Sequence, residues 1–255
     1  MSTLQQATTH ALRLLAPNPS PMTLDGTNTW VLREPGDGAC VVVDPGPLDE
    51  GHLTRICDHG PVALIVLTHG HLDHSEGAAR LHELTNAPVV ARDPKWCIDA
   101  APLEAGTASP VRGVDWVTVL TPGHSSDSVC LLLTADRALL TGDTVLGRGT
   151  TVVAFPDGRL GDYLDSLQRL RDLADTDIDV LLPGHGPVLG TPVAVLSYYL
   201  KHREERLEQV RNALAAGDQE AKDVVRRVYS DVDPALWPAA ELSVRAQLDY
   251  LAANP

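Results

Sequence analysis

The stretch Thr68-His69-Gly70-His71-Leu72-Asp73-His74 is the starting point for interpreting this chain. It places three histidines and one aspartate within six consecutive positions, directly after the apolar run 62–67. An apolar run bounded by Pro61 and by a His-Gly-His turn is typical of a buried strand that ends in a loop. Imidazole nitrogens and carboxylates are ligands for zinc, iron and manganese, and a short turn with glycine can direct several of them to one point. The sequence therefore predicts a metal-binding loop at the C-terminal end of a strand.

Three further candidate ligands follow other predicted strands. His124 follows the strand predicted at 114–120, Asp143 follows 138–141, and His185 follows 178–182. Taken singly, each is also compatible with a turn residue. Because binding sites in α/β proteins tend to lie beyond strand ends, we expect the three to join the first cluster in one site. The remaining histidines are interpreted as structural or solvated: His10, His52, His59, His82 and His202.

The rest of the chain alternates between apolar strands and helical spacing. A loop is expected over 1–30 and a hairpin turn at 35–38, whereas 92–113 has no clear period and is not assigned. The alternation predicts an α/β catalytic domain over 1–191. Strands are expected at 29–33, 39–43, 62–67, 88–90, 114–120, 129–134, 138–141 and 178–182, and helices at 48–59, 75–86 and 163–174. Charge-rich helices expected at 195–216, 221–229 and 239–252 predict a C-terminal helical subdomain over 192–255.

Composition narrows the class of protein. The 255 residues carry a formal net charge of −14, which disfavours extended binding to phosphate backbones without excluding a local basic patch. No stretch approaches the roughly 20 apolar residues that span a bilayer, and Met1–Gln6 lacks the features of a signal peptide. We therefore expect a cytoplasmic protein with no membrane partner. The four cysteines form no C-x-x-C pair, which favours free thiols over disulfides or metal ligands.

The motif H-x-H-x-D-H at 69–74, followed by His124, Asp143 and His185, resembles the metallo-β-lactamase superfamily. The resemblance covers about 17–215 and implies a four-layer αββα sandwich with a two-metal site between the sheets. Within the superfamily, the segments 18–29, 121–127, 142–151, 183–188 and 199–203 are similar to the lactamase-beta-2-like group. That group carries a C-terminal winged-helix-like subdomain, which the helices after 192 would match. This chain departs from the pattern at Glu76, where glycine often follows His-Ser. It also ends at Pro255, so we expect the β-wing to be absent or truncated.

The resemblance also implies a ligand set and a chemistry. His69, His71 and His124 would hold one metal; Asp73, His74 and His185 would hold a second; Asp143 would bridge both. The implied activity is that of a dinuclear zinc hydrolase that uses a metal-bridging hydroxide, with iron or manganese as alternative metals and Asp73 orienting the hydroxide. Animal members of the group are described as endoribonucleases acting on single-stranded RNA, and some fungal members as thioesterases acting on carrier-protein-bound polyketides.

Several alternatives stay open at the level of sequence. Endoribonuclease activity comes first by resemblance, followed by a thioesterase or small-ester hydrolase, then an iron-dependent oxidoreductase of the same fold. A non-catalytic module that docks RNA or a carrier protein through the C-terminal helices is the remaining class. Arg148, Thr150 and Thr151 are the candidate substrate contacts, because guanidinium and hydroxyl groups suit phosphate or carboxylate oxygens. Asp44 is a candidate for supporting the metal loop from behind. The sequence does not indicate the leaving-group acid or the oligomeric state.

Overall fold

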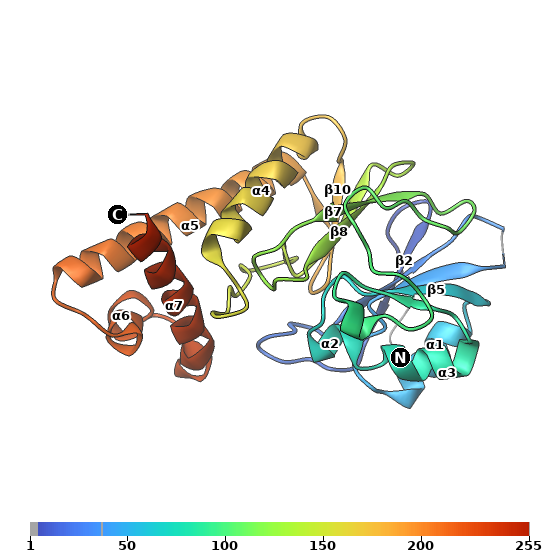
Figure 1. The fold of residues 1–255 in the computed structure, drawn as a ribbon, viewed down its shortest axis with the longest axis horizontal. Helices are drawn as coiled ribbons and strands as arrows, with labels where there is room; N and C mark the ends of the chain where they lie inside the picture. Colours follow the sequence, from blue (N-terminus) through green and yellow to red (C-terminus); the bar gives the residue numbers. More distant parts are fainter. Residues whose placement is uncertain (1–4, 37, 255) are drawn as a thin grey trace.

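The computed structural model, which describes residues 5–36 and 38–254, contains two β-sheets with helices outside them (Figure 1). The first sheet has the order β1-β2-β3-β4-β5-β6, with bounds Gln5–Gln6, Ala11–Leu15, Asn28–Leu32, Cys40–Val43, Val62–Val66 and Val89–Val90. The second has the order β11-β10-β9-β8-β7, and β7 to β11 cover Trp116–Leu120, Val129–Leu133, Ala138–Gly142, Val180–Pro183 and Leu189–Gly190. Two sequence predictions fall partly outside the described residues. The turn expected at 35–38 includes Asp37, and the N-terminal stretch considered for a signal peptide includes residues 1–4.

Strand direction brings the loops of interest to one edge. Strands β4, β5 and β6 pair in parallel, so the residues after β4 and after β5 emerge on the same side of the first sheet. In the second sheet β9 and β10 are also parallel, which aligns the segments that follow them. The loops that carry the predicted ligands therefore meet where the two sheets face each other.

The hydrophobic core has three layers around the sheets. Side chains from both sheets interdigitate between them, including Trp30, Val66, Leu131 and Leu140. Helices α1 (Glu50–Cys57) and α3 (Ala78–Thr85) cover the outer face of the first sheet. Helices α4 (Leu160–Ala174) and α5 (Pro192–Ala215) cover the outer face of the second. The predicted αββα sandwich is confirmed.

Local sequence explains these helices. The carboxylate of Asp49 caps α1 by accepting a hydrogen bond from the backbone N–H of His52 at 2.7 Å. Helix α4 buries Tyr163, Leu167 and Leu170 on one face, at the three- to four-residue spacing of an amphipathic helix. Pro192 occupies the first turn of α5, where its missing N–H costs no hydrogen bond.

The C-terminal helices extend beyond the sandwich. Helices α6 (Ala221–Val228) and α7 (Trp237–Ala253) form a small core with the end of α5, and the 3₁₀ turn η2 (Pro234–Leu236) directly precedes α7. Helix α5 contributes Tyr199 to the sandwich and Val210 to this small core, so it links both parts. The described part of 192–254 contains no strand. The division at residue 192 stays a prediction.

Two expectations from the sequence were wrong. Residues 1–30 were expected to form a loop, but β2 (Ala11–Leu15) pairs with β3 and buries Leu12 and Leu14. A helix was expected to begin at Ser75, but one turn, α2 (Leu72–Ser75), comes first and α3 starts only at Ala78. The backbone N–H of Gly77 donates to the carbonyl of Gly46 at 2.9 Å instead of to a carbonyl of α2. The helical hydrogen bonding is therefore interrupted between α2 and α3. Asp73 and His74 therefore lie on a helical turn.

Other expectations agree with the structure. All four cysteines are unpaired, with Cys40 and Cys130 fully buried. The unassigned region 92–113 contains a 3₁₀ turn, η1 (Pro94–Trp96), and otherwise winds without helices among its described residues. Within the described ranges no helix has the length and apolar character needed to cross a membrane.

Candidate metal centre

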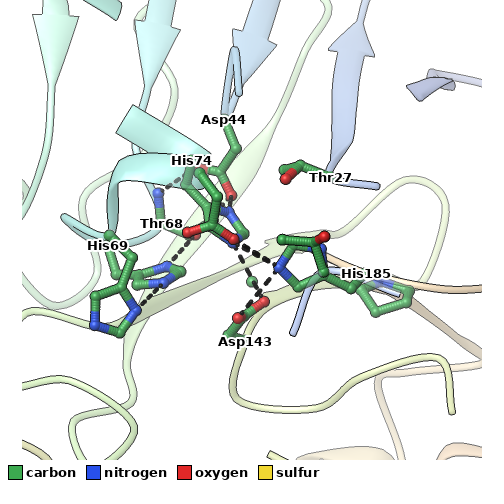
Figure 2. A network of polar contacts seen from close by, with 12 residues as sticks. Thr27, Asp44, Thr68, His69, His74, Asp143 and His185 are labelled. Atoms are coloured by element: carbon green, nitrogen blue, oxygen red, sulfur yellow. Dashed lines mark hydrogen bonds and ion pairs between the residues drawn. The ribbon is translucent and has the colours of Figure 1, made fainter. Parts of the chain in front are cut away.

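The predicted ligands come together at the edge where the two sheets meet. Four of them are labelled in Figure 2: His69, His74, Asp143 and His185. They arrive from five places in the chain: the segment after β5, the turn α2, and the segments after β7, β9 and β10. Three overlapping groups have donor atoms that lie within 4.8 Å of one another: His69, His71 and His124; His69, His74 and Asp143; Asp73, His74 and His185. The ligand positions drawn from resemblance are thus spatial neighbours, and their role as ligands is taken up below as a proposal.

The first group consists of three histidine nitrogens. The Nε2 atom of His69 lies 3.0 Å from the Nδ1 atom of His71, and the Nε2 atom of His124 also lies 3.0 Å from that Nδ1. His69 and His124 are buried, whereas His71 is exposed.

The second group combines histidines with carboxylates. The Nε2 atoms of His74 and His185 lie 3.1 Å apart, and an oxygen of Asp73 lies 3.1 Å from Nε2 of His185. Asp143 stands between the two groups. Its oxygens lie 3.4 Å from the Nε2 atoms of both His74 and His185 and 3.8 Å from Nε2 of His124.

In three of the four buried histidines of the site, Nδ1, the ring nitrogen that points away from the cluster, has a partner that only accepts hydrogen bonds. Nδ1 of His74 donates to the carboxylate of Asp44 at 2.9 Å, and Nδ1 of His124 donates to the carbonyl of Val152 at 2.7 Å. Nδ1 of His185 donates to the carbonyl of Gly26 at 3.2 Å. A neutral imidazole carries one N–H, so each of these rings, once it has given up any second proton, presents the lone pair of its inner Nε2 atom.

His69 is oriented in the same way through a hydroxyl group. Thr68 Oγ1 donates to Asp44 at 2.7 Å, which leaves that oxygen to accept from Nδ1 of His69 at 3.1 Å. The backbone N–H of Thr68 also donates to Asp44, at 2.8 Å. One buried carboxylate, that of Asp44, therefore supports both His69 and His74 from behind, as Figure 2 shows.

The electrostatics of the site favour positive charge. Burial lowers the pKa of His69 well below its ordinary value, so that ring stays neutral. Burial acts in the same direction on His185, but the negative charge of Asp143 outweighs it and raises the pKa of His185 to about 9. The pKa of Asp143 itself is held well below its ordinary value by His74 and His185, although burial opposes this. The negative charge that favours a proton on His185 also favours a metal cation in its place, and metal binding then releases the proton.

The donor set fits divalent cations. One oxygen of Asp143, Oδ1, is buried without a hydrogen-bond partner in the described part of the chain. Lone pairs of neutral imidazoles facing one another at about hydrogen-bond distance repel unless a cation or proton lies between them. Nitrogen and carboxylate donors of this kind suit zinc, iron or manganese.

The candidate substrate residues lie beside the site in different ways. They line a cavity of about 410 Å³ that also reaches His124 and Asp143. Arg148 is exposed and forms a bidentate ion pair with Asp25, at 2.7 and 2.9 Å. The buried hydroxyl of Thr151 donates to the backbone carbonyl of Asp143 at 2.7 Å, so it supports that ligand position. Thr150 is half-buried at the wall of the cavity.

Sequence reasoning missed the contribution of α5 to this cavity. His202, Arg203 and Arg206 line it, although His202 had been interpreted as structural or solvated. The three-residue spacing of Arg203 and Arg206 places both on one helical face. Nothing in the sequence indicates which face of α5 turns toward the metal centre, because the packing of α5 against α4, α6 and α7 sets that.

Comparison with protein families and curated proteins identifies relatives along the whole chain. Residues 22–185 match the metallo-beta-lactamase superfamily, and residues 221–254 match the beta-lactamase associated winged helix domain. The beta-lactamase-like protein 2 homolog of Drosophila melanogaster is 34% identical over 268 residues, covering 96% of this chain and 88% of the relative. The atrochrysone carboxyl ACP thioesterase of Aspergillus fumigatus is 32% identical over 226 residues, covering 84% of this chain and 67% of the relative.

Solved structures support the same assignment at the level of fold. A metallo-β-lactamase family protein from Thermus thermophilus superposes with a TM-score of 0.81 at 23% identity. The match covers 96% of this chain and 93% of that protein, so it includes the C-terminal helices. With its two sheets, its outer helices, and a family match over most of the sandwich, the chain belongs to the metallo-β-lactamase superfamily.

Proposed function

We propose that this chain is a two-metal hydrolase. The observation that carries the proposal is the convergence of imidazole nitrogens from two histidine groups on the carboxylate of Asp143, whose oxygens lie 3.4 Å from the Nε2 atoms of two rings and 3.8 Å from that of a third. His69, His71 and His124 would hold one cation; Asp73, His74 and His185 would hold the other; Asp143 would contact both. Zinc is the metal we propose, with iron or manganese as alternatives.

Two divalent cations in such a site lower the pKa of water enough to supply hydroxide near neutral pH and polarise a carbonyl or phosphoryl oxygen. The protein's own groups hold this site in place. Asp44 fixes the ring of His74 and, through Thr68, the ring of His69. The pKa of Asp73 lies below its ordinary value despite burial, because His185 donates to it, so the carboxylate stays ionised near neutral pH. It is also the more exposed of the two site carboxylates, which suits a group that orients the nucleophile.

For the substrate, we propose an ester or thioester. The cavity beside the site has aliphatic walls built by η2 and α7, which suit an acyl or aryl group. The thioesterase named among the relatives supports the same class. Single-stranded RNA is the second candidate, favoured by the resemblance to the lactamase-beta-2-like group and by the three arginines of the cavity, which suit phosphate.

The test compares turnover by metal-loaded wild type, Asp73→Ala and Asp165→Ala. Asp165 is an exposed aspartate on α4 and serves as the matched control. Each protein is assayed on a panel of acyl-thioesters and on end-labelled single-stranded RNA, with circular dichroism to verify folding. We expect thioester turnover by wild type and by the control, and none by a folded Asp73→Ala protein. An unaltered rate in Asp73→Ala would contradict the proposal, and cleavage of RNA alone would assign the second substrate.

A further inference from the structure

The cavity beside the metal centre is closed on one side by the C-terminal helices. It lies between the segment 146–152 and helices α5 and α7, and it reaches His124 and Asp143. At about 410 Å³ it is large enough for the body of a small organic ligand. A substrate whose reacting bond lies at the metal centre would therefore place its remaining part against these helices.

The residues that line the cavity carry an excess of positive charge, although the chain as a whole is acidic. Arg148, Arg203 and Arg206 line it, whereas Asp143 is the one acidic residue among the described lining residues. Arg148 is already neutralised by Asp25. Within the described chain, neither Arg203 nor Arg206 has a carboxylate within ion-pair distance. This leaves two uncompensated positive charges on one face of α5.

Arg203 is occupied by the protein itself. Its side chain is only 5% exposed, its Nη2 donates to the carbonyl of Thr151, and its guanidinium lies 5.1 Å from the ring centre of Tyr163. It therefore anchors the segment 149–152 to α5. With so little exposed surface, and with its Nε atom buried without a hydrogen-bond partner among the described residues, this guanidinium is poorly accessible to a ligand, so Arg203 is a positioning residue.

Arg206 is fixed by contacts within the protein but keeps N–H groups that are not hydrogen-bonded to described residues. Its guanidinium stacks 4.5 Å from the ring centre of Tyr229, and its Nη1 donates to the carbonyl of Val228 at 3.1 Å and to Gln209 at 2.8 Å. Among the described residues, its Nε and Nη2 atoms have no hydrogen-bond partner. A half-buried, pre-oriented guanidinium with free N–H groups is suited to bind a carboxylate or a phosphate.

Part of the remaining wall of the cavity is aliphatic. Val232, Leu236, Ala239, Ala240 and Leu24 line the same cavity as Arg206. Aliphatic side chains of this kind offer no hydrogen bonds to the polar edge of a nucleobase, and the phenol ring of Tyr229 is already stacked on Arg206. The ligand that matches is an apolar group that carries an anion.

We propose that the cavity selects ester or thioester substrates whose apolar body bears a carboxylate or phosphate, and that Arg206 binds this anion. The inference rests on the proposed function of the neighbouring site and specifies its substrate class. Arg206 thus acts as a specificity-determining residue contributed by the C-terminal helices.

The test measures equilibrium binding, which does not require turnover. Isothermal titration calorimetry with the metal-loaded full chain compares 4-phenylbutyrate, phenyl phosphate and the neutral 4-phenylbutyramide. The variants are Arg206→Gln, Arg206→Lys and, as matched control, Arg211→Gln, an exposed arginine on the same helix whose partner is Glu208. Because binding is read directly, a failure of hydrolysis leaves this test unaffected, and a failure here leaves the hydrolase proposal standing.

We expect Arg206→Gln to weaken binding of at least one anionic probe about tenfold, the size of one charge-assisted hydrogen bond, while binding of the amide is unchanged. Arg206→Lys should restore part of the loss, and Arg211→Gln should bind like wild type. A loss for the carboxylate alone or the phosphate alone would assign the anion. Equal affinities of Arg206→Gln and wild type for both anions, or an equal loss for the amide, would overturn the proposal.

Discussion

Replacing Asp44 by asparagine tests whether the metal centre depends on its outer hydrogen bonds. One carboxylate oxygen of Asp44 accepts from the backbone N–H of Thr68 at 2.8 Å, and the other accepts from Thr68 Oγ1 at 2.7 Å and from Nδ1 of His74 at 2.9 Å. Asparagine keeps one oxygen for the backbone N–H. Its amide nitrogen then faces His74 as a donor, so Nδ1 of that ring must become the acceptor and the proton must move to Nε2.

The consequence is selective for one of the two metal positions. A proton on Nε2 of His74 removes a lone pair from the group formed with Asp73 and His185. Thr68 Oγ1 can still accept from His69, so the other group keeps its ligands. Loss of a hydrogen bond to a charged group costs about 1.5–3 kcal/mol. Loss of the group that hydrogen-bonds a metal-binding histidine typically lowers metal affinity about 10- to 100-fold. Converted to free energy, this loss is similar to the cost of the hydrogen bond.

The assay is zinc stoichiometry at equilibrium with a series of zinc-chelator buffers. Wild type should fill two sites, and Asp44→Asn should fill one normally and the other only at about 10- to 100-fold higher free zinc. The matched control is Asp99→Asn, because Asp99 has the same left-handed backbone, with φ of 53° at both positions, and a side chain that is 81% exposed. Asparagine tolerates this conformation, so backbone strain should not differ. Wild-type affinity at both sites in a folded Asp44→Asn protein would refute the reasoning.

Three further predictions follow from the packing around the site. Gly184→Ala should displace zinc without unfolding the protein, since a Cβ atom there would lie 2.6 Å from Asp143 Oδ1; Gly190→Ala, which meets no atom within 4 Å, should bind zinc normally in the same stoichiometry assay. Burial lowers the pKa of His52 to about 4, so the folded state binds fewer protons than the unfolded state between pH 4 and 6.5 and stability falls as pH falls through that window. Urea unfolding should show about 2 kcal/mol less stability at pH 5 than at pH 7 from this group, and His52→Gln should lack that component; an identical pH dependence in the variant would contradict the assignment. Arg203→Met should lower the free energy of unfolding by about 1–3 kcal/mol, because it leaves a buried carbonyl without its donor; an unchanged urea midpoint would show that the anchor contributes nothing.

The sequence alone predicted the strands and the candidate ligands, and its resemblance to a known superfamily implied the αββα architecture. Apolar runs that end in His-Gly-His, Pro-Gly-His and Gly-Asp identify strands and the polar residues after them, because strand periodicity and turn residues are local properties. The αββα fold is confirmed, and the predicted ligands lie together in space. Local patterns failed at β2, where Arg13 interrupts a short apolar stretch and only pairing with β3 stabilises a strand. They also failed at Ser75, where a contact between Gly77 and Gly46 divides the expected helix.

Tertiary structure alone decided how the site is supported and what faces it. The contact between Asp44 and His74 joins residues 30 positions apart, and it exists because β4 and β5 are parallel and end at the same edge. Arg206 is one of many charged residues on a long polar helix, and the packing of α5 against α6 and α7 is what turns it toward the cavity. Spacing within a helix shows which residues share a face, but the direction of that face depends on long-range burial of apolar surface.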